Sequence, residues 1–575
     1  MVVVRSGRFR TRPMAVALIA TASLVVAGAV TIFTGGVASA AVEDDGTDCA
    51  TSIPGTLTSN AKLPDPFSRL DGTRISSTSD WRCQREEIRK LEERYVYGTK
   101  PGKPATVTGT VSRTSISVSV SDSGHSASFS ASVSVPSGTG PFPAVIVVGG
   151  LGADTATIQG AGVAIINYDP LQVGAEGTAR TAKSGAFYSI YGSTSSTGLL
   201  AAWAWGVSRI IDVIEQSGTS VFKVDSLGVT GCSRYGKGAF AVGAFDERIA
   251  LTMPIESGTA GVPILRGIPG ESGSQPLSSA YNEQPWFGDA FTSFTGNPNT
   301  LPVDQDEVIG MIAPRGLLIM ENPHIDWLAA KSGSVSALAG AEIYKALGVG
   351  NNISYWSDVQ DATHCAVRPE WKAPLQASLQ AFLLHTGNPP AVFRISSLKA
   401  GNLADWRTWT TPTLTGGTPS AMPSSPRPSM TPSSTPSMTP SGTPSITPSM
   451  TPSVTRSSTP SSSPSTSPPP PPPPGACTAT YQAVNSWPGG FQAQVTVANP
   501  TTSTMLGWTV DWVMPDGETI TSAWNGTLSQ AGSLATVKNA DWNNQLAPSG
   551  STSFGFTANY SASPVVPSSI SCQSP

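Results

Sequence analysis

A segment that cannot fold divides this chain into two parts. From Thr411 to Gly475 the sequence reduces to repeats of Thr, Pro and Ser, and it ends in the proline run 468–474. Such a segment lacks the apolar side chains that a core needs, and its prolines favour an extended polyproline II conformation. We therefore predict a linker over residues 411–475, with a separately folded domain on each side.

The first forty residues predict secretion. Four arginines between residues 5 and 12 precede an apolar run over residues 14–30, and Ala38-Ser39-Ala40 has the small side chains that signal peptidase accepts. We predict a signal peptide over residues 1–40, because this cleavage pattern disfavours the alternative of a membrane anchor. Since no other stretch is long and apolar enough to span a bilayer, we expect no membrane partner. The net charge of −4 argues against nucleic acid as a partner.

The two folded domains differ in their hydrophobic patterns. Residues 41–410 alternate strand-like and helix-like segments, which predicts an α/β fold with a three-layer sandwich. Residues 476–575 contain only short alternating strands separated by turns, which predicts a β-sandwich. The expected strands of the first domain are 107–120, 127–135, 144–148, 227–230, 249–253 and 353–356, and its expected helices include 199–214, 238–245 and 375–384.

A nucleophile motif lies where an expected strand meets an expected helix. The sequence Gly231-Cys232-Ser233-Arg234-Tyr235-Gly236 resembles the G-x-S-x-G elbow of α/β-hydrolases, with one extra residue before the second glycine. A Gly-x-Ser turn alone is weak evidence, because most such turns have no catalytic role. The strand before and the helix after it make Ser233 the candidate nucleophile.

A serine nucleophile needs a base, and the chain has four histidines. His125 precedes the strand that leads into the elbow, and His385 lies at the end of an expected helix, where a capping role is more common. His324 remains possible. We favour His364, because it follows the expected strand 353–356 in a polar loop, where an α/β-hydrolase places the last member of its triad.

The acid of the triad is expected between the serine and the histidine along the chain. Glu256 follows the expected strand 249–253 and so lies at its C-terminal end. Glu321 and Asp326 are rivals on position alone. An acid at this place would orient the histidine and stabilise its imidazolium form.

The six cysteines of a secreted chain are expected to pair. Cys477 and Cys572 bracket the C-terminal domain and are predicted to close it. The other four allow three connectivities. If Ser233 and His364 meet, their neighbours Cys232 and Cys365 come close enough for a bridge. That pairing leaves Cys49 with Cys83.

These residues resemble the glucuronoyl esterases, the fifteenth family of carbohydrate esterases. The resemblance covers most of residues 49–384 and is most specific over residues 229–239, which contain Gly-Cys-Ser-Arg-Tyr-Gly-Lys. It implies a triad of Ser233, Glu256 and His364. It also implies an oxyanion role for Arg234, through its backbone N–H and its side chain. The residues that it implies for binding the glucuronoyl ring are Lys237, Gln275, Glu283 and Trp327.

The C-terminal domain resembles the second family of carbohydrate-binding modules over nearly its whole length. Trp508 lies on an alternating strand and is expected in the core, while the position of Trp512 is ambiguous. The turn-rich surroundings of Trp487, Trp524 and Trp542 favour exposure, and three exposed rings on one face would form a platform for stacking on sugars. Three rings rather than two resemble the cellulose-binding branch of the family.

Together these patterns predict a secreted serine esterase, a monomer, that cleaves esters between glucuronoxylan and lignin and binds a cellulose surface. Neither a metal nor an organic cofactor is expected, because acyl transfer by a serine triad needs none. One alternative is another esterase of plant polymers, of the acetyl xylan esterase type. The other is a cellulose-binding protein whose hydrolase domain is inert.

Overall fold

The computed structural model divides the chain into two compact units, residues 1–424 and residues 425–575. The described residues are 43, 45–53, 55–218, 220–416, 477–487, 490–515, 517–524, 526–540, 543–548, 550–560 and 565–574, without the side chains of 484–487, 522 and 524. The predicted signal peptide and nearly all of the predicted linker lie outside these residues.

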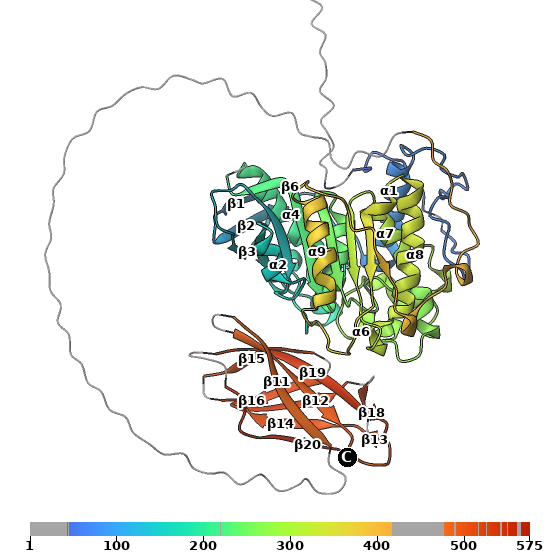
Figure 1. Ribbon diagram of the computed structural model, residues 1–575. Coiled ribbons are helices and arrows are strands. Elements are labelled where there is room, and N and C mark those ends of the chain that lie inside the picture. The colour runs from blue at the N-terminus through green and yellow to red at the C-terminus, as the bar shows by residue number, and fades with distance from the viewer. Residues whose placement is uncertain are drawn as a thin grey trace, which may run out of the picture. The chain divides into compact units, whose positions relative to one another are not determined.

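A ten-stranded mixed sheet forms the centre of the first unit (Figure 1). Its strand order is β1-β2-β3-β5-β4-β6-β7-β8-β9-β10. The neighbours in β1-β2-β3-β5 pair antiparallel, and the neighbours in β5-β4-β6-β7-β8-β9-β10 pair parallel. The strands are β1 Thr106–Val111, β2 Ser115–Asp122, β3 His125–Ser134, β4 Phe142–Val148, β5 Ala164–Tyr168, β6 Phe222–Cys232, β7 Ile249–Ile255, β8 Gly316–Met320, β9 Ile353–Trp356 and β10 Phe393–Arg394.

Helices cover both faces of this sheet and complete three layers. Helices α2 and α9 pack on one face, and helices α1, α4, α5, α7 and α8 belong to the core on the other. Figure 1 shows α9 lying across the front of the sheet. The helices are α1 Trp81–Glu92, α2 Thr155–Gly160, α3 Ala186–Tyr191, α4 Leu199–Gln216, α5 Arg234–Phe245, α6 Leu277–Asn282, α7 Gln305–Ile312, α8 Ala330–Ala346 and α9 Pro369–Phe382.

The sequence of β4 shows why the sheet has two cores. All seven of its residues are buried. Because successive side chains of a strand point to opposite faces, Ile146 and Val148 enter the larger core, whereas Val145 and Val147 pack under α2 and α9. The three-layer α/β fold predicted from the sequence is confirmed.

Several expected elements have different bounds in the structure, and two of these differences have a clear physical reason. The alternating stretch 107–120 forms two antiparallel strands, β1 and β2, because Ser112 turns the chain: its hydroxyl accepts from Ser115 N (2.9 Å). Helix α5 begins at Arg234, four residues earlier than expected from the apolar pattern. Hydrophobic periodicity misses this first turn because it carries the functional residues.

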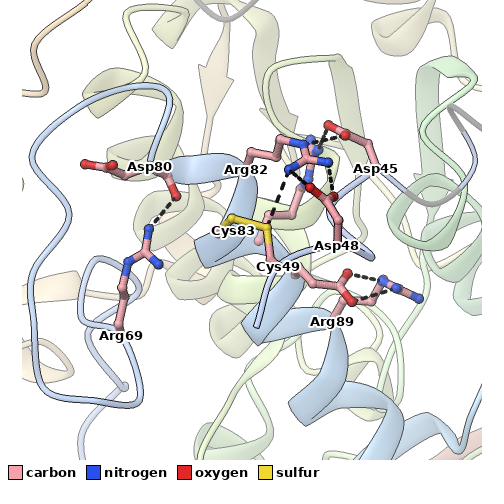
Figure 2. The surroundings of a disulfide bond; sticks show 10 residues. Asp45, Asp48, Cys49, Arg69, Asp80, Arg82, Cys83 and Arg89 are labelled. Carbon is pink, nitrogen blue, oxygen red and sulfur yellow. Dashed lines mark hydrogen bonds and ion pairs between the residues drawn. A yellow bond between two sulfur atoms is a disulfide. The ribbon is translucent and has the colours of Figure 1, made fainter. Parts of the chain in front are cut away.

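A disulfide and a set of ion pairs hold the N-terminal segment to α1 (Figure 2). Cys49 is bonded to Cys83 in the first turn of the helix. Four residues before Cys49, the Asp45 carboxylate accepts from Arg82 Nε (2.6 Å) and Arg85 Nη2 (3.1 Å). The disulfide removes conformational freedom from the unfolded chain, so it stabilises this attachment.

The chain remains attached to the first unit beyond the predicted start of the linker. Trp409 is buried, the Thr411 hydroxyl donates to the Glu342 carboxylate, and Thr415 N donates to Ser76 O (2.9 Å). The first unit thus includes Gly416, although the Thr/Pro composition begins at Thr411. Composition does not reveal these contacts, because backbone groups and a hydroxyl make most of them.

The second unit consists of antiparallel strands. Two four-stranded sheets, β11-β12-β19-β15 and β16-β17-β14-β20, share one core, and β13 pairs with β18. Cys477 and Cys572 form the disulfide that joins its two ends. The strands are β11 Thr478–Trp487, β12 Gly490–Ala498, β13 Met505–Leu506, β14 Thr509–Val513, β15 Thr519–Trp524, β16 Gly526–Ala531, β17 Leu534–Asn539, β18 Gln545–Leu546, β19 Ser551–Asn559 and β20 Ile570–Gln573.

Two tryptophans build the core of the second unit. Trp508 stacks on Phe554 at 5.5 Å between ring centroids, and Trp512 stacks on Phe556 at 5.2 Å. Both indoles are buried, which confirms the prediction for Trp508 and resolves the ambiguity at Trp512. The predicted platform cannot be placed in this way: the side chains of Trp487 and Trp524, and all of Trp542, lie outside what the structure describes.

Candidate active site

Ser233 lies in a strained turn between β6 and α5. Its φ of 58° and ψ of −128° are unusual for a residue with a side chain, and strain of this kind is characteristic of a nucleophile elbow. Ser233 N donates to Ile255 O of β7 (2.9 Å), and its carbonyl accepts from Lys237 N (3.0 Å), which fixes the turn against the sheet and the helix.

Two glycines make this tight turn possible. A Cβ at Gly231 would lie 2.0 Å from Tyr235 O, and a Cβ at Gly236 would lie 2.5 Å from Ile255 O. Both approaches are too close for any side chain. The extra residue in the motif therefore has a physical explanation. The residue that passes against β7 is Gly236, the third after Ser233, and not the second as in G-x-S-x-G.

Glu256 and His364 form a hydrogen-bonded pair beside the elbow. Glu256 follows β7, is fully buried, and its Oε2 accepts from His364 Nδ1 (2.6 Å) and from Cys365 N (2.7 Å). Asn322 Nδ2 donates to the other carboxylate oxygen at 3.3 Å. With Nδ1 held in this way, His364 Nε2 is buried and has no hydrogen-bond partner among the described residues, so it is available for proton transfer.

A disulfide fixes the loop of His364 to the elbow. Cys232 and Cys365 are bonded, with 5.8 Å between their Cα atoms. They directly precede Ser233 and directly follow His364. All three disulfides in the structure have the predicted pairing, including Cys49–Cys83 and Cys477–Cys572.

The rival acids lie elsewhere. The Asp326 carboxylate is exposed and pairs with Lys399 Nζ at 2.8 Å. Glu321 is fully buried, and its Oε1 accepts from Ser257 Oγ (3.3 Å). Burial, followed by the neighbouring negative charge of Glu256, raises the pKa of Glu321 to about 8, so this carboxyl is mainly protonated at neutral pH. A neutral carboxyl cannot stabilise an imidazolium as a carboxylate does.

The other histidines also have contacts outside the pair. His324 Nε2 lies 2.8 Å from Val359 O. His385 follows α9 with a φ of 55°, and its Nε2 lies 3.4 Å from Ser226 Oγ. His125 begins β3, opposite Asp122.

The predicted sugar-binding cluster, Lys237, Gln275, Glu283 and Trp327, is connected through a chain of contacts to His364. The Trp327 ring packs edge-on against the His364 ring, with 4.6 Å between centroids. Gln275 N donates to Trp327 O (3.2 Å), and Gln275 Nε2 donates to Glu283 Oε2 (2.6 Å). These contacts place Gln275 and Glu283 next to Trp327, which itself lies against the His364 ring.

Lys237, the remaining member of this cluster, is buried. Its Nζ donates to Ser257 O (2.6 Å) and lies 5.0 Å from the centroid of the Trp286 ring. Burial lowers the pKa of Lys237 to about 8. The side chain therefore carries a positive charge at neutral pH but loses it under mildly alkaline conditions.

Sequence reasoning missed three residues that support the site. Glu176 Oε2 pairs with Arg234 Nη1 at 2.5 Å, Asn322 contacts Glu256 as described above, and Arg368 Nη2 donates to Thr363 O (2.6 Å), one residue before His364. None of them lies in a recognisable motif. Only the folded structure brings their loops to the triad.

One group of side chains in the described part of the chain has the spacing of metal ligands: Cys232, Glu256, His364 and Cys365. Both cysteines are disulfide-bonded, so neither offers a thiolate, and the Glu256 carboxylate already takes several hydrogen bonds. The group does not fit a metal site. That the reaction needs no metal or cofactor stays a prediction.

Comparison with known families assigns both units. Residues 118–348 match the family model described as glucuronyl esterase, fungi, and residues 477–574 match the model described as cellulose binding domain. A 4-O-methyl-glucuronoyl methylesterase of Hypocrea jecorina is 37% identical over 376 residues, covering 64% of this chain and 80% of that relative. The enzyme of the same name from Neurospora crassa is 37% identical, covering 62% of this chain and 90% of that relative.

Solved structures agree with these sequence matches. The glucuronoyl esterase catalytic domain from Hypocrea jecorina has a TM-score of 0.58 at 36% identity and covers 63% of this chain and all of that one. A mutant glucuronoyl esterase from Sporotrichum thermophile, in complex with methyl 4-O-methyl-β-D-glucopyranuronate, has a TM-score of 0.60 at 37% identity. The match covers 64% of this chain and 100% of that one. The chain belongs to the glucuronoyl esterases, with a C-terminal domain of the cellulose-binding type.

Proposed function

We propose that this protein is a secreted, monomeric serine esterase that hydrolyses esters between the (4-O-methyl-)glucuronic acid side chains of glucuronoxylan and lignin alcohols. The observation that carries the proposal is the Glu256–His364 pair, bridged by a disulfide to the strained elbow of Ser233, in a chain of this family. Disulfides support an extracellular location. Among the described residues, no helix is long and apolar enough to cross a membrane.

The geometry supports acyl transfer in two steps. Ser233 Oγ attacks the ester carbonyl while His364 Nε2 takes its proton, and Glu256 stabilises the imidazolium formed. The tetrahedral intermediate then collapses, and His364 gives the proton to the departing alcohol. In the second step His364 takes a proton from water, which attacks the glucuronoyl–Ser233 ester and releases glucuronate and the free serine.

Other groups provide charge and position. Arg234 follows Ser233 at the start of α5, where its backbone N–H and its guanidinium support the oxyanion. The predicted sugar-binding cluster orients the glucuronoyl ring. The domain of residues 476–575 attaches the enzyme to cellulose through Trp487, Trp524 and Trp542, and the linker of residues 411–475 lets the catalytic domain of residues 41–410 reach esters nearby.

A comparison of soluble substrates tests this proposal against its alternatives. We expect hydrolysis of benzyl and methyl glucuronate, with little release of acetate from acetylated xylan, because Lys237 and Glu283 are suited to a uronic acid ring. Preferential release of acetate would favour an acetyl xylan esterase. Absence of all ester hydrolysis, with cellulose binding retained, would favour an inert hydrolase domain.

A further inference from the structure

We propose that Glu176 is a positioning residue of this active site, which acts by holding the side chains of Arg234 and Trp286. The inference rests on the proposed function, because it assumes that Arg234 supports the oxyanion. Glu176 lies in the loop between β5 and α3. Its side chain is only 8% exposed, although it is charged and comes from a loop.

Each oxygen of the Glu176 carboxylate has its own partner. Oε2 accepts from Arg234 Nη1 at 2.5 Å, and Oε1 accepts from the indole Nε1 of Trp286 at 2.7 Å. The first donor belongs to the residue directly after the nucleophile. The second belongs to a ring whose face lies 5.0 Å from the ammonium of Lys237. One carboxylate therefore connects the oxyanion side of the site to the predicted sugar-binding cluster.

Only a carboxylate satisfies this arrangement. The guanidinium and the indole N–H are both donors, and neither can accept a hydrogen bond. An amide of the same shape has one oxygen and one NH₂ group, so it could accept from one partner but would face the other with a second donor. A buried donor left without an acceptor is costly. Glutamine at this position should therefore release either Arg234 or Trp286.

The surroundings hold the loop of Glu176 against the segment that carries Trp286. Gly177 N donates to Gln284 Oε1 (2.6 Å), and Arg180 Nη2 donates to Tyr281 O (2.6 Å). These contacts do not involve the Glu176 carboxylate. A substitution of Glu176 should therefore disturb the two held side chains more than the path of the backbone.

Fixing the arginine has a catalytic consequence. A long side chain loses rotamer entropy when it is held in one conformation. The ion pair with Glu176 imposes that ordering before substrate binds, so the guanidinium is already in place when charge develops on the carbonyl oxygen. Loss of Glu176 should therefore lower kcat more than it raises KM.

The test is a double-mutant cycle between Glu176→Gln and Arg234→Ala, with kcat and KM measured on benzyl glucuronate. We expect Glu176→Gln alone to lower kcat about tenfold, and to have less than about a twofold effect on kcat once Arg234 is alanine, because interacting residues are not additive. Glu342→Gln is the matched control: this carboxylate is also paired, but it lies on α8 and its partners, Arg407 and Thr411, belong to the segment that follows the triad residues in the chain. It should leave kcat unchanged.

A variant of Trp286 gives a second, independent readout. Phenylalanine has no N–H, so in the Trp286→Phe background a glutamine at position 176 can accept from Arg234 without conflict. We expect Glu176→Gln to cost clearly less in that background than in the wild type. If Glu176→Gln unfolds, Glu176→Asp replaces it in both cycles, because the shorter side chain cannot reach both donors.

Two results would overturn the inference: an unchanged kcat in Glu176→Gln, or an equal loss with and without the Arg234 side chain. Failure of the proposed function looks different. In that case the wild type would not hydrolyse benzyl glucuronate, and both cycles would be run on 4-nitrophenyl acetate, whose hydrolysis needs the same serine and oxyanion groups.

Discussion

The Ser233→Ala variant is expected to hydrolyse benzyl glucuronate with a kcat/KM lower than that of the wild type by about 10⁴-fold or more. Alanine removes the oxygen that forms the acyl intermediate. His364→Ala should cause a comparable loss, because Ser233 then has no base. Glu256→Ala should cause an equal or smaller loss, since Glu256 acts through His364.

The measurement is steady-state hydrolysis, combined with thermal unfolding to show that each variant is folded. His385→Gln is the matched control for His364, because His385 is exposed at the end of α9 and should be dispensable. More than about 1% residual activity in Ser233→Ala would mean that another group is the nucleophile. Nearly full activity in Glu256→Ala would move the acid role to Glu321 or Asp326.

Ending the chain after Gly416 is expected to abolish retention on crystalline cellulose and to leave turnover of soluble glucuronate esters nearly unchanged. Each unit has its own hydrophobic core, and the catalytic residues all belong to the first. The module acts by raising the local concentration of enzyme at the wall, so its removal matters only for insoluble substrates. Sedimentation with microcrystalline cellulose measures retention.

Substitution of the three predicted platform residues, Trp487, Trp524 and Trp542, by alanine should reproduce the loss of retention in the full chain. Val513→Ala is the matched control, because this apolar side chain is 56% exposed on the same module. If the triple variant still sediments with cellulose, the platform is wrong. If the shortened enzyme loses activity on soluble esters, the catalytic unit is not independent.

The structure brings the residues predicted for the triad together, and the sequence could point to them because the patterns around them are local. The strand, the turn and the helix around Ser233 are adjacent in the chain, and the polar loop of His364 follows a short apolar strand. Pairing Cys232 with Cys365 then followed from their neighbours. These inferences depended on short-range patterns, which the fold preserves.

The supporting residues could not be found in this way. Glu176 and Asn322 come from loops far from Ser233 in sequence, and their roles depend on which donor lies within about 3 Å. The attachment of residues 411–416 to the first unit could not be predicted from the sequence either, because the Thr/Pro composition of this stretch is that of the linker. Side-chain and backbone contacts between distant segments leave no periodic signal.

Cleavage of the ester between glucuronoxylan and lignin is tested most directly with a lignin–carbohydrate fraction from wood. The fraction is incubated with the wild type and with Ser233→Ala, and the new carboxylates on 4-O-methyl-glucuronic acid residues are quantified together with the lignin alcohols released. We expect both products in equal amounts with the wild type and neither product with Ser233→Ala. Equal product from the two proteins, or acetate as the only acid released by the wild type, would contradict this expectation.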